Sequence, residues 1–265
     1  MRTLGRVVNR GEPGAVSSGA ASLRRRSRRL AGRGLRAARW RIRRLTYRST
    51  GPCRWLPPDL TLDEFFDILR REQVTYAVLR WFEDLPEVEP GHDIDMLVSD
   101  EHVDFVQSLL ANRPRKGAQH FDVYSASGLP GSDLDGTPCF PPQLAHELLT
   151  NAVWLRGAYR VPEPEAHFLG LAFHAAYHKG YKSGLRSGSS ADEVRGHASH
   201  DYETVLADLA ERLGEPLVPT LDGVDRYLAA RDLRPAPDAL RSLARTNRWI
   251  ADRFGEQLPD VDPPR

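Results

Sequence analysis

The chain has 265 residues, of which 40% are hydrophobic and 28% charged, and its formal net charge is +1. This length predicts one large domain, or one domain with a small partner. No apolar run reaches the roughly 18 residues that a transmembrane helix needs, and the N-terminus lacks the apolar segment of a secretory signal. The two cysteines, Cys53 and Cys139, lie far apart. They predict neither a disulfide framework nor a thiolate zinc site, and they favour a cytoplasmic location.

The net charge hides an uneven distribution, because the first 50 residues hold 15 Arg and one acidic residue. Residues 1–22 are rich in Gly, Ser and Ala without periodicity, which is typical of disorder. From Leu35, apolar residues at helical spacing predict a short amphipathic helix covered by arginines. Residues 1–54 therefore predict a disordered basic tail. Either this tail is simply solvated, or residues 24–48 bind nucleic acid or an anionic membrane surface at the inner face of the membrane.

The segment after the tail predicts a compact α+β domain. Thr61 and Glu64 form a capping box before an amphipathic helix, and Asp100 is placed to cap a second helix. Short apolar runs predict strands at 76–79, 93–98 and 120–125. This α-β-β-α-β order with short links predicts a mixed sheet flanked by helices.

The rest of the chain predicts mainly helices. A hairpin is expected with Arg156-Gly157 at its turn, between a Gly/Pro-rich loop with a helix after it and a strongly apolar helix. The expected helices are 143–150, 162–180, 202–213, 224–230 and 239–254. We therefore predict an α/β domain over residues 55–160 and a helical C-terminal region over residues 161–265.

Two aspartates, Asp93 and Asp95, carry the strongest functional signal. Side chains alternate along a strand, so both carboxylates point to one face of the sheet. Such carboxylates repel each other unless a cation lies between them, and Mg²⁺ binds one or two carboxylates together with substrate phosphates. The pair therefore predicts a Mg²⁺ or Mn²⁺ site for phosphoryl or nucleotidyl transfer. The alternative is a turn at the strand edge with solvated acids.

The order of these features resembles the nucleotidyltransferase fold of the DNA polymerase beta superfamily. In that fold a strand leads into a Gly-Ser turn, and a second strand carries Asp-x-Asp about ten residues later. Residues 60–125 follow this order, but Leu79-Arg80-Trp81 stands where the family has Gly-Ser. Together with Gly91-His92-Asp93-Ile94-Asp95, this segment looks like an uncharacterised bacterial nucleotidyltransferase-like group.

The resemblance implies a third carboxylate on a later strand, for which Asp122 is the candidate, either as a metal ligand or as a base. It also implies that Gly91 and His92 lie beside the nucleotide phosphates. Arg80 is expected to replace the Gly-Ser contact with a bidentate phosphate contact; the alternative is an ion pair with Glu83 or Asp84.

The implied activity is Mg²⁺-dependent transfer of a nucleotide monophosphate from a nucleoside triphosphate such as ATP. The acceptor is a hydroxyl of unknown identity, and a sugar- or polysaccharide-linked acceptor is one option. The alternative is a non-catalytic binding or scaffold protein of the same fold that associates with an anionic ligand or a membrane surface.

A second group of residues lies on one predicted helix. His167, His174 and His178 share a helical face, and they either bind zinc, line a polar seam at the catalytic cleft, or pack in the interior. Ala175 stands where the zinc motif His-Glu-x-x-His has its glutamate. Lys179 and Lys182, two of only three lysines, are predicted to contact donor phosphates from the helix end, with a solvated helix terminus as the alternative.

Overall fold

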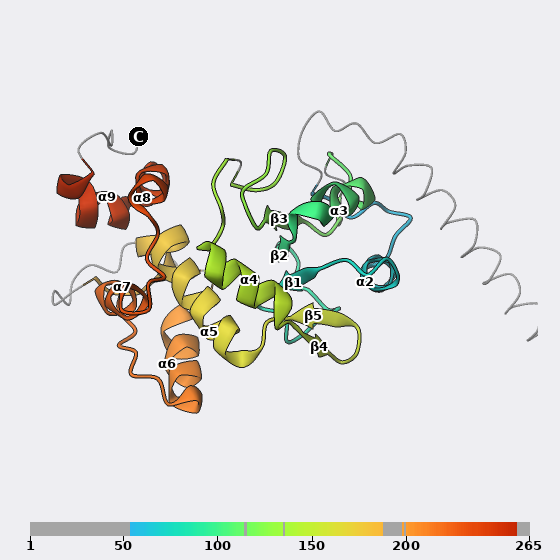
Figure 1. Cartoon of the computed structure of the whole chain (residues 1–265). Helices are drawn as coiled ribbons and strands as arrows, with labels where there is room; N and C mark the ends of the chain where they lie inside the picture. Colours follow the sequence, from blue (N-terminus) through green and yellow to red (C-terminus); the bar gives the residue numbers. More distant parts are fainter. Residues whose placement is uncertain (1–53, 114–115, 135, 188–197, 199, 259–265) are drawn as a thin grey trace, which may run out of the picture. The chain divides into compact units, whose positions relative to one another are not determined.

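The computed structural model describes residues 54–113, 116–134, 136–187, 198 and 200–258. Within them, helices combine with a small mixed sheet, which confirms the α+β class (Figure 1). The predicted basic tail, except Arg54, lies outside the described residues, as does the predicted helix from Leu35. No helix in the described part of the chain is long and apolar enough to cross a membrane.

The sheet has three strands in the order β1-β2-β3. Strand β1 (Tyr76–Val78) pairs antiparallel with β2 (Ile94–Val98), which pairs parallel with β3 (Phe121–Ser125). All residues of β1 and β2 are buried, as expected for apolar strands covered on both faces. The parallel register places Asp95 opposite Asp122, so the two predicted acidic strands lie side by side.

One helix precedes β1 in the chain and another lies between β2 and β3. Helix α2 (Leu62–Arg71) begins with the predicted capping box, in which the Thr61 side chain accepts from the Glu64 amide and the Glu64 side chain accepts from the Thr61 amide. Helix α3 (Val103–Leu109) follows a 3₁₀ turn, and the predicted Asp100 cap is wrong. The Asp100 carboxylate instead accepts a hydrogen bond from the Ser127 amide at 3.1 Å, so it holds the loop after β3.

Helix α4 (Pro142–Thr150) leads into the predicted hairpin of β4 (Val153–Leu155) and β5 (Tyr159–Val161). Arg156 and Gly157 form its turn with φ angles of 49° and 68°. Positive φ at both central positions is typical of a type I′ turn, which the Ala158 amide closes by donating to the Leu155 carbonyl at 3.0 Å.

Helix α5 (Pro164–Phe173) continues into a π-helix, His174–Lys179. Four further helices follow, and their bounds are α6 (Tyr202–Leu213), α7 (Leu221–Ala229), α8 (Pro237–Ala244) and α9 (Arg248–Phe254). The single helix predicted over residues 239–254 is therefore two helices. They separate at Asn247, whose side chain accepts from the Ile250 amide at 3.3 Å and begins α9.

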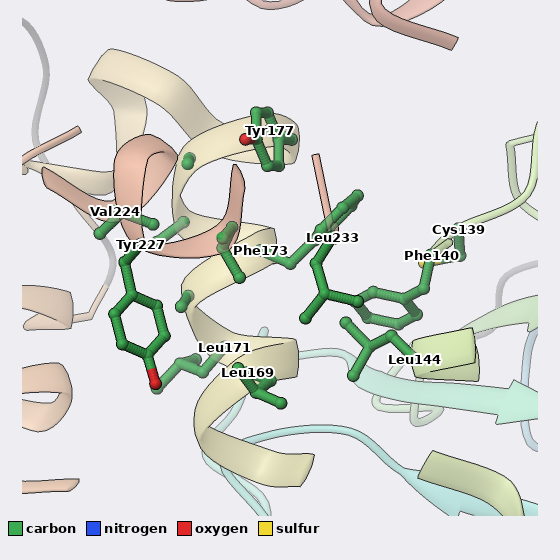
Figure 2. Packing of buried hydrophobic residues seen from close by; sticks show 14 of the residues in the cluster. Cys139, Phe140, Leu144, Leu169, Leu171, Phe173, Tyr177, Val224, Tyr227 and Leu233 are labelled. Carbon is green, nitrogen blue, oxygen red and sulfur yellow. The ribbon is translucent and has the colours of Figure 1, made fainter. Parts of the chain in front are cut away.

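One hydrophobic cluster extends from Leu79 to Leu258 and is centred on α5. Residues 166–173 are all buried, as is usual for a helix that is apolar all round. Figure 2 shows Phe140 and Leu144 on one side of α5 and Val224 and Tyr227 on the other. Helix α5 thereby connects the sheet side, through α4, with the C-terminal helices.

Candidate functional site

A cavity of about 380 Å³ opens at the edge of the sheet where β1 ends and β2 begins. Its lining comes from the residues after β1, the first residues of β2, residues of β3, the π-helix and the start of α6. Ligand pockets have volumes of roughly 300–1,000 Å³, so the cavity is large enough for a small molecule. Most of the candidate site residues predicted from the sequence line this cavity.

Asp95 and Arg80 form a buried ion pair at the base of this cavity. The antiparallel register of β1 and β2 brings them together, since the Leu79 amide donates to the Asp95 carbonyl at 2.9 Å. The Tyr124 hydroxyl also donates to the Asp95 carboxylate at 3.3 Å. The partner of Arg80 is thus Asp95, and the expected alternative of a pair with Glu83 or Asp84 is wrong for the described residues.

Burial and mutual attraction act against each other in this pair. Burial raises the pKa of Asp95, and the Arg80 guanidinium opposes that rise. Burial acts to lower the pKa of Arg80, but the charge of Asp95, with smaller contributions from neighbouring groups, raises it above the ordinary value. Arg80 is therefore a permanent cation held against Asp95.

Asp93 and Asp122 meet at the rim of the cavity with His120 between them. The His120 Nδ1 lies 2.9 Å from the Asp93 carboxylate and 3.6 Å from that of Asp122. Among the described residues these three form the one group whose potential metal-ligand atoms lie within 4.8 Å of one another. Asp95 does not belong to this group. The structure therefore brings Asp93 and Asp122 together, whereas Asp95 forms an ion pair with Arg80.

His120 was missed in the sequence, although a signal was present. It stands two residues before Asp122, so alternation places both side chains on one face of β3, and the parallel register continues Asp93 opposite His120. Two carboxylates and an imidazole are donors that suit Mn²⁺ better than Mg²⁺, since Mg²⁺ prefers oxygen ligands alone. This donor set fits a divalent cation.

The two predicted lysines lie in different surroundings. Lys179, at the end of the π-helix, lines the cavity, and among the described residues it has no ion-pair partner within 4 Å. Lys182 is exposed and does not line the cavity. Gly91 and His92 both line it, and Gly91 has a φ of 92°, which favours glycine.

The three histidines of the helix do not meet as metal ligands. The Nδ1 atoms of His174 and His178 are 3.0 Å apart, whereas His167 lies against the ring of Phe82 at 4.8 Å. Burial lowers the pKa of His167 to about 4 and that of His178 to about 3. His174 alone of the three lines the cavity. These residues are thus uncharged interior groups rather than a zinc centre.

No protein-family model, no curated protein and no solved structure matches this chain. The expected resemblance to nucleotidyltransferases therefore rests on the sequence order of residues 75–98 alone.

Proposed function

We propose that this chain is a metal-dependent nucleotidyltransferase of the DNA polymerase beta type. It moves a nucleotide monophosphate from a nucleoside triphosphate to a hydroxyl of an acceptor, with a sugar-linked acceptor as one option. The observation that supports this best is the meeting of Asp93 and Asp122 at the ends of adjacent strands, on the rim of a cavity that also contains Lys179.

In this proposal Asp93, His120 and Asp122 hold a Mn²⁺ or Mg²⁺ ion. The bound ion supplies charge stabilisation for the transferring phosphoryl group. Lys179 contacts the donor phosphates from the end of the π-helix, and Gly91 lets the backbone approach them closely. The alternative role for Asp122 is that of the base that accepts the proton of the acceptor hydroxyl.

Calorimetry with nucleoside triphosphates, with and without Mn²⁺ or Mg²⁺, tests the proposal. Asp93→Asn and Asp122→Asn are suitable variants because both side chains are partly exposed, so the fold tolerates them. Asp104→Asn, on the exposed face of α3, is the matched control. We expect metal-dependent binding to weaken at least tenfold in both site variants and to stay unchanged in the control.

Transfer itself is measured as pyrophosphate release with a panel of sugars as acceptors. We expect release by the parent protein and its loss in both site variants. Parental metal-dependent binding in both Asp93→Asn and Asp122→Asn contradicts the proposed metal site.

One observation favours a non-catalytic binding protein as the second candidate. The Arg80 guanidinium already neutralises Asp95, the carboxylate that an Asp-x-Asp motif otherwise offers to a metal. In that case the chain binds an anionic ligand or membrane surface without chemistry. Nucleotide binding that does not depend on metal, together with no pyrophosphate release, supports this second candidate.

A further inference from the structure

Aromatic side chains form one wall of the cavity. The rings of Trp81 and His200 are stacked, with centroids 4.1 Å apart and planes inclined by 15°. Tyr202 meets Trp81 edge-on at 5.5 Å, and the His92 ring lies 5.0 Å from that of His200. All four residues line the cavity. Base-binding proteins stack aromatic faces of this kind on planar rings.

Trp81, in this wall, has a left-handed backbone conformation. Its φ is 53°, a conformation that is rare for a bulky residue and that persists where the surroundings impose it. Its neighbours Arg80 and Phe82 are both buried, whereas Trp81 is only partly buried. The chain therefore directs two neighbouring side chains inward and leaves the indole at the cavity.

The stacked pair of this wall, Trp81 and His200, is uncharged, unlike the wall of carboxylates around Asp93 and Asp122. Burial, followed by the charges of His92 and Lys179, lowers the pKa of His200, so its imidazole is neutral at neutral pH. A cavity with one uncharged aromatic wall and one wall of charged groups suits a ligand with a flat ring and an anionic end.

A buried polar atom next to this wall has no partner. His174 is 3% exposed, and its Nε2 has no hydrogen-bond partner among the described residues. Its ring lies 6.0 Å from that of Tyr202 and lines the same cavity. A buried polar atom without a partner requires an explanation, and a ring bound against this wall lies in the cavity that His174 also lines.

We propose that Trp81 and His200 form a stacking platform for the nucleobase of the donor, with the His174 imidazole beside the edge of the base. This inference rests on the proposed function, since the phosphates of the same nucleotide then lie toward Asp93 and Lys179. The stacking itself requires no metal, because no charged group takes part in it.

The test is calorimetry with adenosine, guanosine, cytidine and uridine in the absence of metal. Removing a stacking ring costs about 1–3 kcal/mol per base, so we expect Trp81→Ala and His200→Ala to weaken nucleoside binding at least about fivefold. Trp154→Ala is the matched control, because Trp154 is exposed on β4 and lies outside the cavity lining. Binding of Mn²⁺-tripolyphosphate should be the same in the parent and in His200→Ala.

Three results overturn the platform: no nucleoside binding by the parent, parental binding in His200→Ala, or binding of methyl glycosides in place of nucleosides. If Trp81→Ala does not fold, as judged by thermal melting, Trp81→Phe and His200→Ala decide the question. Failure of the proposed function looks different. In that case nucleosides still bind and the platform variants still weaken them, but pyrophosphate release and metal dependence are absent.

Discussion

Loss of the Asp95 charge is expected to destabilise the fold strongly. The side chains of Arg80 and Asp95 are only 5% and 11% exposed, so Asp95→Asn leaves a buried guanidinium without its counter-ion. Breaking a buried ion pair in this way costs about 3–5 kcal/mol. For a folded region of about 200 residues each kcal/mol lowers Tm by about 2–4 °C, so a fall of roughly 6–20 °C is expected.

Differential scanning calorimetry and urea unfolding of three variants measure this effect. The double variant Arg80→Met with Asp95→Leu removes both charges, and we expect it to recover most of the lost stability, since apolar replacements of buried pairs are often neutral. Asp252→Asn is the control. It breaks the pair with Arg248, whose side chains are 63% and 38% exposed, and exposed pairs contribute at most about 1 kcal/mol.

A loss below about 1 kcal/mol in Asp95→Asn refutes the reasoning, as does a double variant no more stable than the single one. The expected instability also has a consequence for functional work. Lost activity in Asp95→Asn does not distinguish a metal ligand from a structural partner of Arg80, whereas Asp93 and Asp122 are exposed enough to separate the two roles.

Three further predictions concern buried groups that do not line the cavity. His167 has a pKa of about 4 in the folded state and an ordinary value of about 6.5 when unfolded, so its contribution to stability is present above pH 6.5 and is lost as the pH falls toward 4. Between pH 7 and pH 5, the free energy of unfolding measured with urea should fall by about 2 kcal/mol less in His167→Gln than in the parent. Gly180→Ala should lower Tm by several degrees, because φ is 53° and a Cβ there lies 2.1 Å from the Asn247 Oδ1; an unchanged Tm contradicts this. Arg234→Ala leaves the fully buried Asp225 without its two charged hydrogen bonds of 2.8 and 2.6 Å, and urea unfolding should show a loss of about 2–4 kcal/mol.

Local patterns predicted those elements whose structure depends on local interactions. Helix α6 spans the predicted residues 202–213, because its apolar periodicity is regular and the Asp201 side chain caps it. The break at Asn247 was not predicted. The Asn247 amide donates at 2.9 Å to the carbonyls of Ala176 and Tyr177, in the last turn of the π-helix. Such a contact joins positions about seventy residues apart, and the 3.6-residue periodicity does not contain it.

The sequence predicted which residues belong to the candidate site better than it predicted which of them contact each other. Asp93 and Asp95, which alternation predicts on one face of the sheet, both line the cavity. Alternation did not show which side chain lies beside each carboxylate, because that depends on strand register. The antiparallel pairing of β1 and β2 sets Arg80 beside Asp95, and the parallel pairing of β2 and β3 sets His120 beside Asp93.

The charge of the cavity lining favours metal dependence over simple anion binding. Seven carboxylates line the cavity, against two cations, Arg80 and Lys179, and Arg80 is already paired with Asp95. A triphosphate that enters without a cation meets like charges, each costing about 1–4 kcal/mol at contact distance near a protein surface. A divalent ion between Asp93 and Asp122 offsets the negative charge of these two carboxylates at the place where the phosphates lie in the proposal. Among the described residues that line the cavity, Lys179 is the one cation without a carboxylate partner to offset the excess of carboxylates, so we expect nucleotide affinity to rise with added metal.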